Sequence, residues 1–176
     1  RACFKAADGF HATALTERDE IKAITSSPLI SVIPNGMRVS ICGDLVMGKR
    51  RNRVIAIGRL HHQKGYDLLL RAWQTIEADF PDWALEIRGP STDGHFDELV
   101  ALAGELALAR AKIGGPVNEA IRDQLLTDSK LFVLSSRGEN FALTVPEALH
   151  CKTPVLATKG TPWAGLETQS CGWWVE

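Results

Sequence analysis

The sequence lacks the features that mark several specialised classes of protein. No apolar run approaches the roughly 20 residues that a membrane-spanning helix needs, and no secretory signal opens the chain. The formal net charge is -1 and no long basic block occurs, which argues against a protein that binds nucleic acid by neutralising phosphates. Hydrophobic residues make up 45% of the 176 residues and charged residues 23%, so we expect an ordinary soluble globular protein.

Cysteines and histidines also lack a pattern. The spacing of the cysteines fits neither a CxxC motif nor a zinc site, so we expect free thiols in a reducing compartment at Cys3, Cys42, Cys151 and Cys171. No HExxH motif, metal-ligand cluster or supported Ser-His-Asp arrangement is visible. His61 and His62 could be ligands, but solvated histidines are the commoner case. The sequence pattern therefore offers no metal site.

Helix and strand patterns alternate from about residue 54 onward. Short apolar runs predict strands at 53–60, 83–89, 111–117, 130–136, 153–158 and 171–175. Apolar residues at helical spacing predict a helix in each interval between them, with Asn118 as the expected N-cap of the helix at 118–129. This order predicts an α/β fold, a Rossmann-like parallel sheet with helices on both faces. Ligands of such sheets bind at the carboxyl ends of the strands.

The first 36 residues follow a different pattern. They predict a strand, a helix with Thr16 as its N-cap and Asp19 at its third position, and then a second strand. The polar residues 37–52 predict a linker, which divides the chain into units 1–36 and 53–176. Because the chain begins without methionine and stops on an expected strand, we expect a piece of a longer protein.

The loop GRLHHQKG at 58–65 follows the first strand of the larger unit. The planar guanidinium of Arg59 and the ammonium of Lys64 suit a diphosphate if both converge on this loop. The alternative is two solvated charges on a surface turn, and the loop alone favours that alternative because basic residues are common in loops.

The segment GENFALTVPE at 138–147 joins an expected strand to an expected helix. Unpaired N–H groups at the start of such a helix bind anions. Glu139 could accept hydrogen bonds from sugar hydroxyls, and Glu147 from the two vicinal hydroxyls of a ribose. Alternatively, Thr144-x-x-Glu147 is a capping box that only begins the helix. Local rules leave both interpretations of Glu147 open, whereas Glu139 precedes any cap.

Three segments, taken in order, resemble a known family. They are GRL…QKG from residue 58, GPV at 115–117, and EN-F-A-L-x-x-x-E at 139–147 followed by AL-x-x-x-TPV. The set resembles the retaining nucleotide-sugar glycosyltransferases of family 4, the glycosyl transferases group 1, whose GT-B architecture places two Rossmann-like domains around a cleft. By this resemblance, residues 1–36 end the N-terminal, acceptor-side domain, and residues 53–176 form a truncated C-terminal, donor-binding domain.

The resemblance also implies roles for residues. Glu139, which contacts the donor sugar, and Arg59 and Lys64, which hold the diphosphate, are the expected catalytic residues. Glu147 would bind the ribose and the loop at 116–117 would border the base. The expected donor-binding residues are Gly58, Pro116, Val117, Asn140, Phe141, Ala142, Leu143 and Glu147. Two positions depart from the family, since Ala142 and Lys152 stand where it usually has glycine.

The implied activity is transfer of a sugar from a nucleotide-diphosphate-sugar donor to a glycan or lipid-linked acceptor, with retention, in envelope or surface-polysaccharide synthesis. Such an enzyme needs no cofactor and no metal, and we expect this fragment to be inactive alone because the acceptor binds mainly to the missing domain. The alternatives are a non-catalytic nucleotide-sugar-binding module and a GT-B sugar epimerase. We expect a cytoplasmic location and leave peripheral contact with the inner face of the membrane open.

Overall fold

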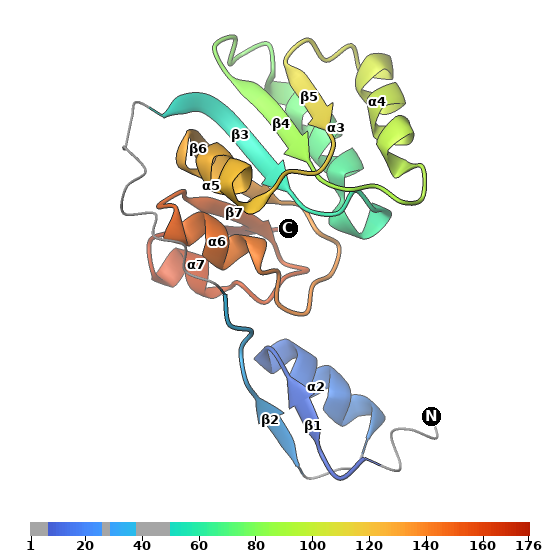
Figure 1. Ribbon diagram of the computed structural model, residues 1–176, viewed down its shortest axis with the longest axis vertical. Helices are drawn as coiled ribbons and strands as arrows, with labels where there is room; N and C mark the ends of the chain where they lie inside the picture. Colours follow the sequence, from blue (N-terminus) through green and yellow to red (C-terminus); the bar gives the residue numbers. More distant parts are fainter. Residues whose placement is uncertain (1–6, 26–28, 38–49) are drawn as a thin grey trace.

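The computed structural model describes residues 7–25, 29–37 and 50–176 (Figure 1). Most of the expected linker 37–52 therefore lies outside the described residues, as do Cys3 and Cys42. The described part contains two separate parallel sheets, one of two strands and one of six. Figure 1 shows the small unit with the two-stranded sheet set apart from the larger body that holds the six strands.

The larger sheet has the strand order β5-β4-β3-β6-β7-β8, and all neighbouring strands are parallel. The strands are β3 (Arg51–Ile57), β4 (Ala84–Arg88), β5 (Ala111–Gly114), β6 (Ser129–Leu134), β7 (Val155–Thr158) and β8 (Gly172–Val175). The strand order reverses between β3 and β6, which is the position where ligands bind in open α/β sheets. The Rossmann-like parallel sheet predicted from the sequence is confirmed.

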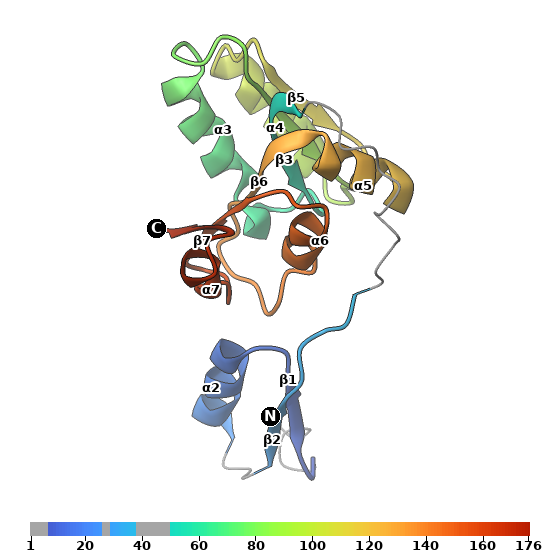
Figure 2. The ribbon, with the colours of Figure 1, turned by 90° about the vertical axis from the view of Figure 1, so that its left-hand side faces the viewer.

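Helices cover both faces of this sheet. Alternate residues of a strand point to opposite faces, and the buried strands have apolar residues on both, so each face needs a covering layer. Val54 and Ala56 of β3 belong to a core cluster that includes Leu70 and Trp73. Ile55 and Ile57 belong to a second cluster that includes Leu126, Val145 and Leu166. The helices are α3 (Tyr66–Ile76), α4 (His95–Glu105), α5 (Glu119–Thr127), α6 (Thr144–His150) and α7 (Gly165–Thr168). Figure 2 shows α3 and α5 on opposite sides of β3 and β6.

Local sequence explains where several elements begin and end. The Asn118 side chain accepts a hydrogen bond of 2.9 Å from the Ile121 N–H, so the predicted N-cap of α5 is confirmed. Arg50 stabilises the carboxyl end of α6, because its guanidinium donates to the carbonyl oxygens of Cys151 and Lys152 at 3.1 and 2.9 Å. Arg50 comes just before β3, which begins at Arg51, two residues earlier than predicted.

The small unit consists of β1 (Phe10–Ala12), α2 (Leu15–Ile24) and β2 (Ile30–Val32). The predicted cap of its helix is wrong, since Thr16 lies inside the first turn and the N-cap Ala14 makes no side-chain bond. Instead, Glu17 Oε2 accepts hydrogen bonds of 2.6 Å from both the N–H and the hydroxyl of Thr13. These bonds lower the pKa of Glu17 and fix the chain at the helix start.

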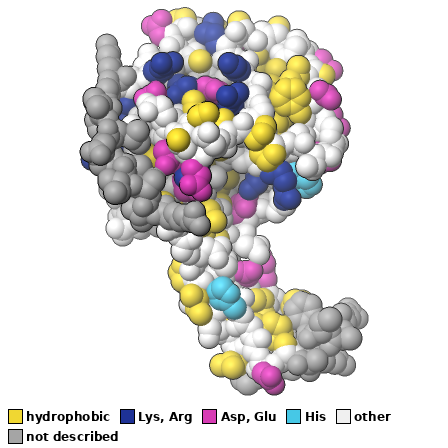
Figure 3. All heavy atoms as spheres, viewed as in Figure 1, with side chains coloured by type: hydrophobic (Ala, Val, Ile, Leu, Met, Phe, Trp, Pro, Cys, Tyr) yellow, Lys and Arg dark blue, Asp and Glu magenta, His cyan; other side chains and the backbone are white. Residues whose placement is uncertain are grey.

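The space-filling view in Figure 3 shows the small unit projecting from the larger body. Asn140 joins the two, because its side-chain amide donates a hydrogen bond of 2.7 Å to Glu17 Oε1. Among the described residues, the helices are all too short or too polar to cross a membrane.

Candidate functional site

The loops that follow β3 and β6 meet at the carboxyl end of the sheet, where the strand order reverses. The first loop contains the short 3-10 helix η2 (His62–Lys64), and the second runs from Ser135 to the start of α6. Lys64 Nζ lies 2.5 Å from Glu139 Oε1, and both side chains are largely buried, with 18% and 12% exposed. The structure therefore brings together two of the three residues expected to be catalytic.

Backbone and side-chain hydrogen bonds hold these loops against each other. Ser135 and Ser136 donate their hydroxyls to the carbonyl oxygens of Lys64 and Gln63, at 2.9 and 3.0 Å. The Ser136 hydroxyl also lies 2.6 Å from Glu139 Oε1, and the Gln63 amide donates to the Gly138 carbonyl at 2.7 Å. This network fixes the Lys64–Glu139 pair without help from a ligand, so the site is preorganised.

Gly65 allows the two loops to approach so closely. Its φ of +63° lies in the left-handed region, which favours glycine. A Cβ at this position would lie 2.1 Å from the Ser135 carbonyl oxygen, closer than any real contact. A side chain at residue 65 would therefore push the turn that carries Lys64 away from β6.

A cavity of about 460 Å³ opens beside the pair. Its lining residues are Asn35, Arg59, Gln63, Lys64, Glu139, Asn140, Phe141, Ala142, Leu143 and Thr144. Arg59 is exposed, and its guanidinium makes no hydrogen bond or ion pair with any residue in the described part of the chain. The cavity thus gathers all three expected catalytic residues and four of the expected donor-binding residues, Asn140 to Leu143.

The turn from Asn140 to Leu143 has an unusual backbone. Within the part of the chain that the structure describes, its four N–H groups donate no hydrogen bond to the protein. Ala142 has a φ of +61°, where a Cβ is disfavoured. Trp163 supports the turn, because its indole N–H donates to the Phe141 carbonyl at 2.6 Å and its ring lies 5.4 Å from the Phe141 ring.

Glu147 lies on α6 and does not line this cavity. Its Oε1 accepts a hydrogen bond of 2.6 Å from the Arg122 guanidinium on α5. The capping-box alternative fails, since α6 begins at Thr144 and no side-chain bond caps it. Burial raises the pKa of Glu147, and Arg122 opposes this effect without cancelling it. The Glu147 carboxylate is therefore destabilised in the folded chain without ligand.

The remaining expected residues lie around the same end of the sheet. A Cβ on Gly58 would be 3.7 Å from Lys64 Cε, so Gly58 lies beside the lysine. Val117 packs against the core cluster that contains Val145, whereas Pro116 is exposed. Neither Pro116 nor Val117 lines the 460 Å³ cavity.

A second cavity, of about 800 Å³, lies between the small unit and the larger one. Thr13, Leu15 and Pro34 line it from the small unit, and Glu139, Trp163 and Trp174 are among the residues that line it from the larger unit. Glu139 lines both cavities.

Sequence reasoning missed Ser136, Arg122 and Trp163. Their partners are Glu139, Glu147 and Phe141, and the last two pairs join residues 25 and 22 positions apart. No local pattern shows such contacts. Ser136 is the exception, because a hydroxyl three residues before a candidate carboxylate could have been noticed.

Comparisons with known proteins agree on one family. The family model described as Glycosyl transferases group 1 matches residues 44–175. The lipopolysaccharide core biosynthesis mannosyltransferase LpcC of Rhizobium leguminosarum bv. viciae is 33% identical over 121 residues, which are 66% of this chain and 34% of that protein. An uncharacterized glycosyltransferase of Haemophilus influenzae is 30% identical over 121 residues, 66% of this chain and 32% of its own length. The chain thus spans about a third of the length of these relatives.

Solved structures show the same fold. TarM superposes with a TM-score of 0.83 at 20% identity, covering 98% of this chain and 34% of that one. HepE of Anabaena, in complex with UDP and glucose, gives a TM-score of 0.74 at 21% identity, covering 96% of this chain and 49% of that one. WaaG, a glycosyltransferase involved in lipopolysaccharide biosynthesis, gives a TM-score of 0.77 at 17% identity, covering 94% of this chain and 49% of that one.

Proposed function

Because the chain belongs to the glycosyl transferases group 1 family, we propose that it is the donor-binding part of an enzyme that transfers a sugar from a nucleoside-diphosphate sugar. The observation that carries this proposal is the Lys64–Glu139 pair, 2.5 Å apart, beside the exposed guanidinium of Arg59 in one cavity. A diphosphate and a sugar need these two kinds of group, cations and a carboxylate, next to each other.

Arg59 and Lys64 bind the diphosphate in this proposal. The leaving group of the transfer is a nucleoside diphosphate whose negative charge grows in the transition state, and fixed cations lower that barrier. An ammonium has three donors and Glu139 takes one of them, so Lys64 can contact a phosphate without losing its partner. The free N–H groups of residues 140–143 add donors on the same side of the cavity. Positioned positive charge then does the work of a metal, and no divalent ion is required for transfer.

Glu139 contacts the hydroxyl groups of the donor sugar. Its Oε1 accepts from Lys64 and lies 2.6 Å from the Ser136 hydroxyl, which leaves Oε2 without a partner among the described residues. An ionised carboxylate accepts hydrogen bonds through both oxygens, and sugar hydroxyls are suitable donors.

Glu147 binds the ribose, with the loop at 116–117 bordering the base. One oxygen of Glu147 is already bonded to Arg122, so the other oxygen is the acceptor for a ribose hydroxyl. Since burial destabilises this carboxylate in the free chain, hydroxyl donors from a ligand would recover part of that cost.

The acceptor is a glycan or a lipid-linked glycan, and the transfer retains the configuration of the sugar, as the family resemblance implies. The names of two relatives, both concerned with lipopolysaccharide, support a role in envelope or surface-polysaccharide synthesis. A cytoplasmic location, with peripheral contact at the inner membrane face, suits that role. Residues 1–36 end an acceptor-side domain, 37–52 link it to the donor domain at 53–176, and the fragment is inactive without the rest of the first domain.

The test is release of free nucleoside diphosphate by a longer chain that also carries the rest of the acceptor-side domain. A transferase releases it from a nucleoside-diphosphate sugar only when an acceptor is present. A non-catalytic binding module releases none with any acceptor, and an epimerase converts the sugar with no acceptor at all. Either of these outcomes would overturn the proposed transfer.

A further inference from the structure

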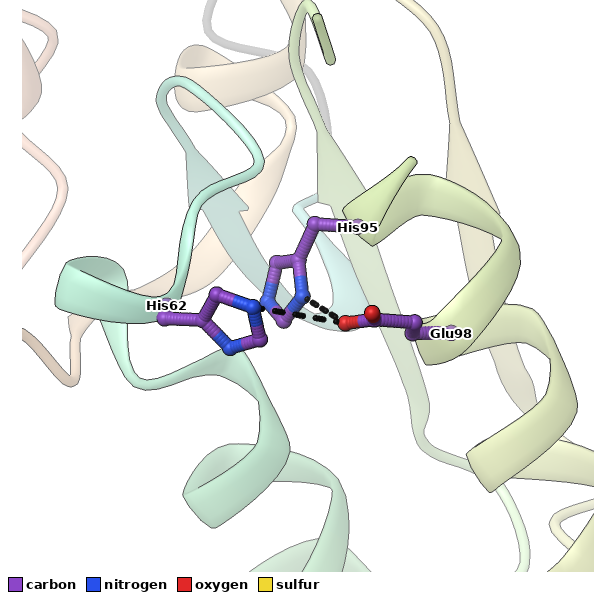
Figure 4. Close-up of side chains that lie close together, drawn as sticks. All are labelled: His62, His95 and Glu98. Atoms are coloured by element: carbon purple, nitrogen blue, oxygen red, sulfur yellow. Dashed lines mark hydrogen bonds and ion pairs between the residues drawn. The ribbon is translucent and has the colours of Figure 1, made fainter. Parts of the chain in front are cut away.

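A cluster of three potential metal ligands lies outside the cavities described above. His62 belongs to η2, while His95 and Glu98 belong to the first turn of α4. His62 Nε2 lies 3.5 Å from Glu98 Oε2, and His95 Nδ1 lies 2.7 Å from the same oxygen. The ligand atoms all lie within 4.8 Å of one another. Figure 4 shows the two imidazole rings and the carboxylate pointing toward one another from the two elements.

The buried member of the cluster is His95, whose side chain is only 3% exposed. Its Nε2 is completely buried and has no hydrogen-bond partner in the described part of the chain. The nitrogen that faces Glu98 is the other one, Nδ1. The His95 ring stands 4.0 Å from the His62 ring, measured between centroids.

We propose that His62, His95 and Glu98 bind a divalent first-row transition-metal ion, with Zn²⁺ as the best fit. Two imidazoles and one carboxylate form a ligand set that zinc uses in proteins, and a fourth position stays open for water. Zinc bonds of roughly 2.0–2.2 Å in a tetrahedron place neighbouring ligand atoms about 3.4 Å apart. The separation of 3.5 Å between His62 and Glu98 already matches that value. The shorter His95–Glu98 separation of 2.7 Å is a hydrogen bond that a small side-chain movement would open.

The surrounding charge favours a cation. The amino end of α4 carries a partial positive charge, which disfavours a bound cation. However, the carboxylates of Asp97 and Glu98 lie in the first turn of this helix. Asp93 lies just before it, with one oxygen 3.4 Å from the His95 N–H and the other 3.9 Å from His61 Nε2. Three carboxylates therefore offset the helix end.

The metal would tie α4 to the turn that carries Lys64. His62 and Lys64 are the two ends of η2, and the His62 carbonyl accepts a hydrogen bond of 2.5 Å from Arg137. His62, His95 and Glu98 do not line either cavity. The metal site thus stands independently of the proposed sugar transfer, which needs no metal ion.

The test is a titration of the metal-stripped 176-residue chain with Zn²⁺ in competition with a chromophoric chelator. The variants are His62→Ala and Glu98→Gln, whose side chains are 67% and 59% exposed, so neither change should disturb folding. His61→Asn, on the same turn, is the matched control because its side chain can still accept a bond from the Gln63 N–H, as His61 does. Thermal unfolding without zinc checks that all four proteins are equally folded.

The expected result is a high-affinity zinc ion in the parent and in His61→Asn, and at least about tenfold weaker binding of that ion in His62→Ala and in Glu98→Gln. Zinc should also raise the unfolding temperature of the parent, since it binds only the folded cluster. Zinc held by cysteines or other groups would be common to all four proteins, so the test depends only on the difference in zinc affinity between the parent and each variant. Equal affinity in the parent and both variants, or no binding at all, would overturn the proposal.

Discussion

Lys64 and Glu139 are 75 residues apart in the chain, yet the lysine ammonium lies 2.5 Å from the glutamate carboxylate. The pair forms because β3 and β6 are neighbours in a sheet whose order reverses between them. It places an ammonium and a carboxylate at one point, and these are the two kinds of group that the proposed donor site needs.

Arg59→Ala should lower the transfer rate of the complete enzyme by roughly 10²-fold or more, as loss of an electrostatic contact in the transition state does. The measurement is the initial rate at saturating donor. Arg71→Ala is the matched control, since Arg71 is an exposed arginine on α3 that lines neither cavity. Near-normal turnover in Arg59→Ala would remove this residue from the mechanism.

Glu147→Gln should weaken nucleotide binding without destabilising the free chain. Burial raises the pKa of Glu147 above its ordinary 4.5. A carboxyl with a raised pKa in the folded state adds stability below pH 4.5 and loses it as pH rises through the folded pKa. The glutamine cannot ionise, so the variant should not lose the stability that the parent loses when Glu147 ionises. Arg122 keeps Asp123, 2.8 Å away, as a partner.

The measurement is urea unfolding of the parent and of Glu147→Gln at several pH values from 4.5 upward. We expect the free energy of unfolding of the variant to increase relative to that of the parent as pH rises. A variant that instead becomes progressively less stable than the parent would show that Glu147 is a stabilising partner of Arg122.

Ala142→Gly should raise the free energy of unfolding by up to about 1 kcal/mol, because a residue with a Cβ is strained in the left-handed region. Ala142 has a φ of +61°, and Lys152 has a φ of +58°. These are the two positions where the family usually has glycine, so Lys152→Gly should be stabilising or neutral as well. Ala101→Gly, at an exposed position inside α4, is the control and should destabilise by about 0.5–1 kcal/mol. Equal losses at positions 101, 142 and 152 would contradict the observed backbone.

Gly65→Ala should destabilise the chain by at least about 1–3 kcal/mol, since it combines overpacking with a strained backbone. Its Cβ would meet the Ser135 carbonyl oxygen at 2.1 Å. Gly104→Ala is the matched change, because its Cβ meets nothing within 4 Å and alanine favours a helix. Chemical unfolding of both variants gives the comparison. If the two substitutions had the same effect, the close approach of η2 to β6 would be disproved.

The sequence predicted the sheet and the positions of its strands because apolar periodicity depends only on neighbouring residues. The cap at Asn118 followed from the same local rules and is confirmed, whereas the cap at Thr16 is wrong because Glu17 bonds back to Thr13. The grouping of Arg59, Lys64 and Glu139 in one cavity agrees with the order of the motifs.

Contacts between distant segments could not be predicted from local patterns. Arg122 on Glu147, Trp163 on Phe141 and Arg50 on the end of α6 depend on how the helices pack against one another. The cluster of His62, His95 and Glu98 was missed for the same reason, since two of its members are 33 or more positions from the third. The sequence did mark Ala142 and Lys152 as unusual, but only the backbone gives the physical reason.

The most direct test of the donor site is a calorimetric titration of this chain with UDP, GDP and ADP, for the parent, Lys64→Ala and Arg71→Ala. We predict that one diphosphate binds the parent and Arg71→Ala equally, and that Lys64→Ala weakens its binding at least about tenfold, as loss of a charged contact in a preorganised site does. Binding that is unchanged in Lys64→Ala, or no binding of any diphosphate at millimolar concentration, would contradict the assignment of the cavity between β3 and β6 as a donor site.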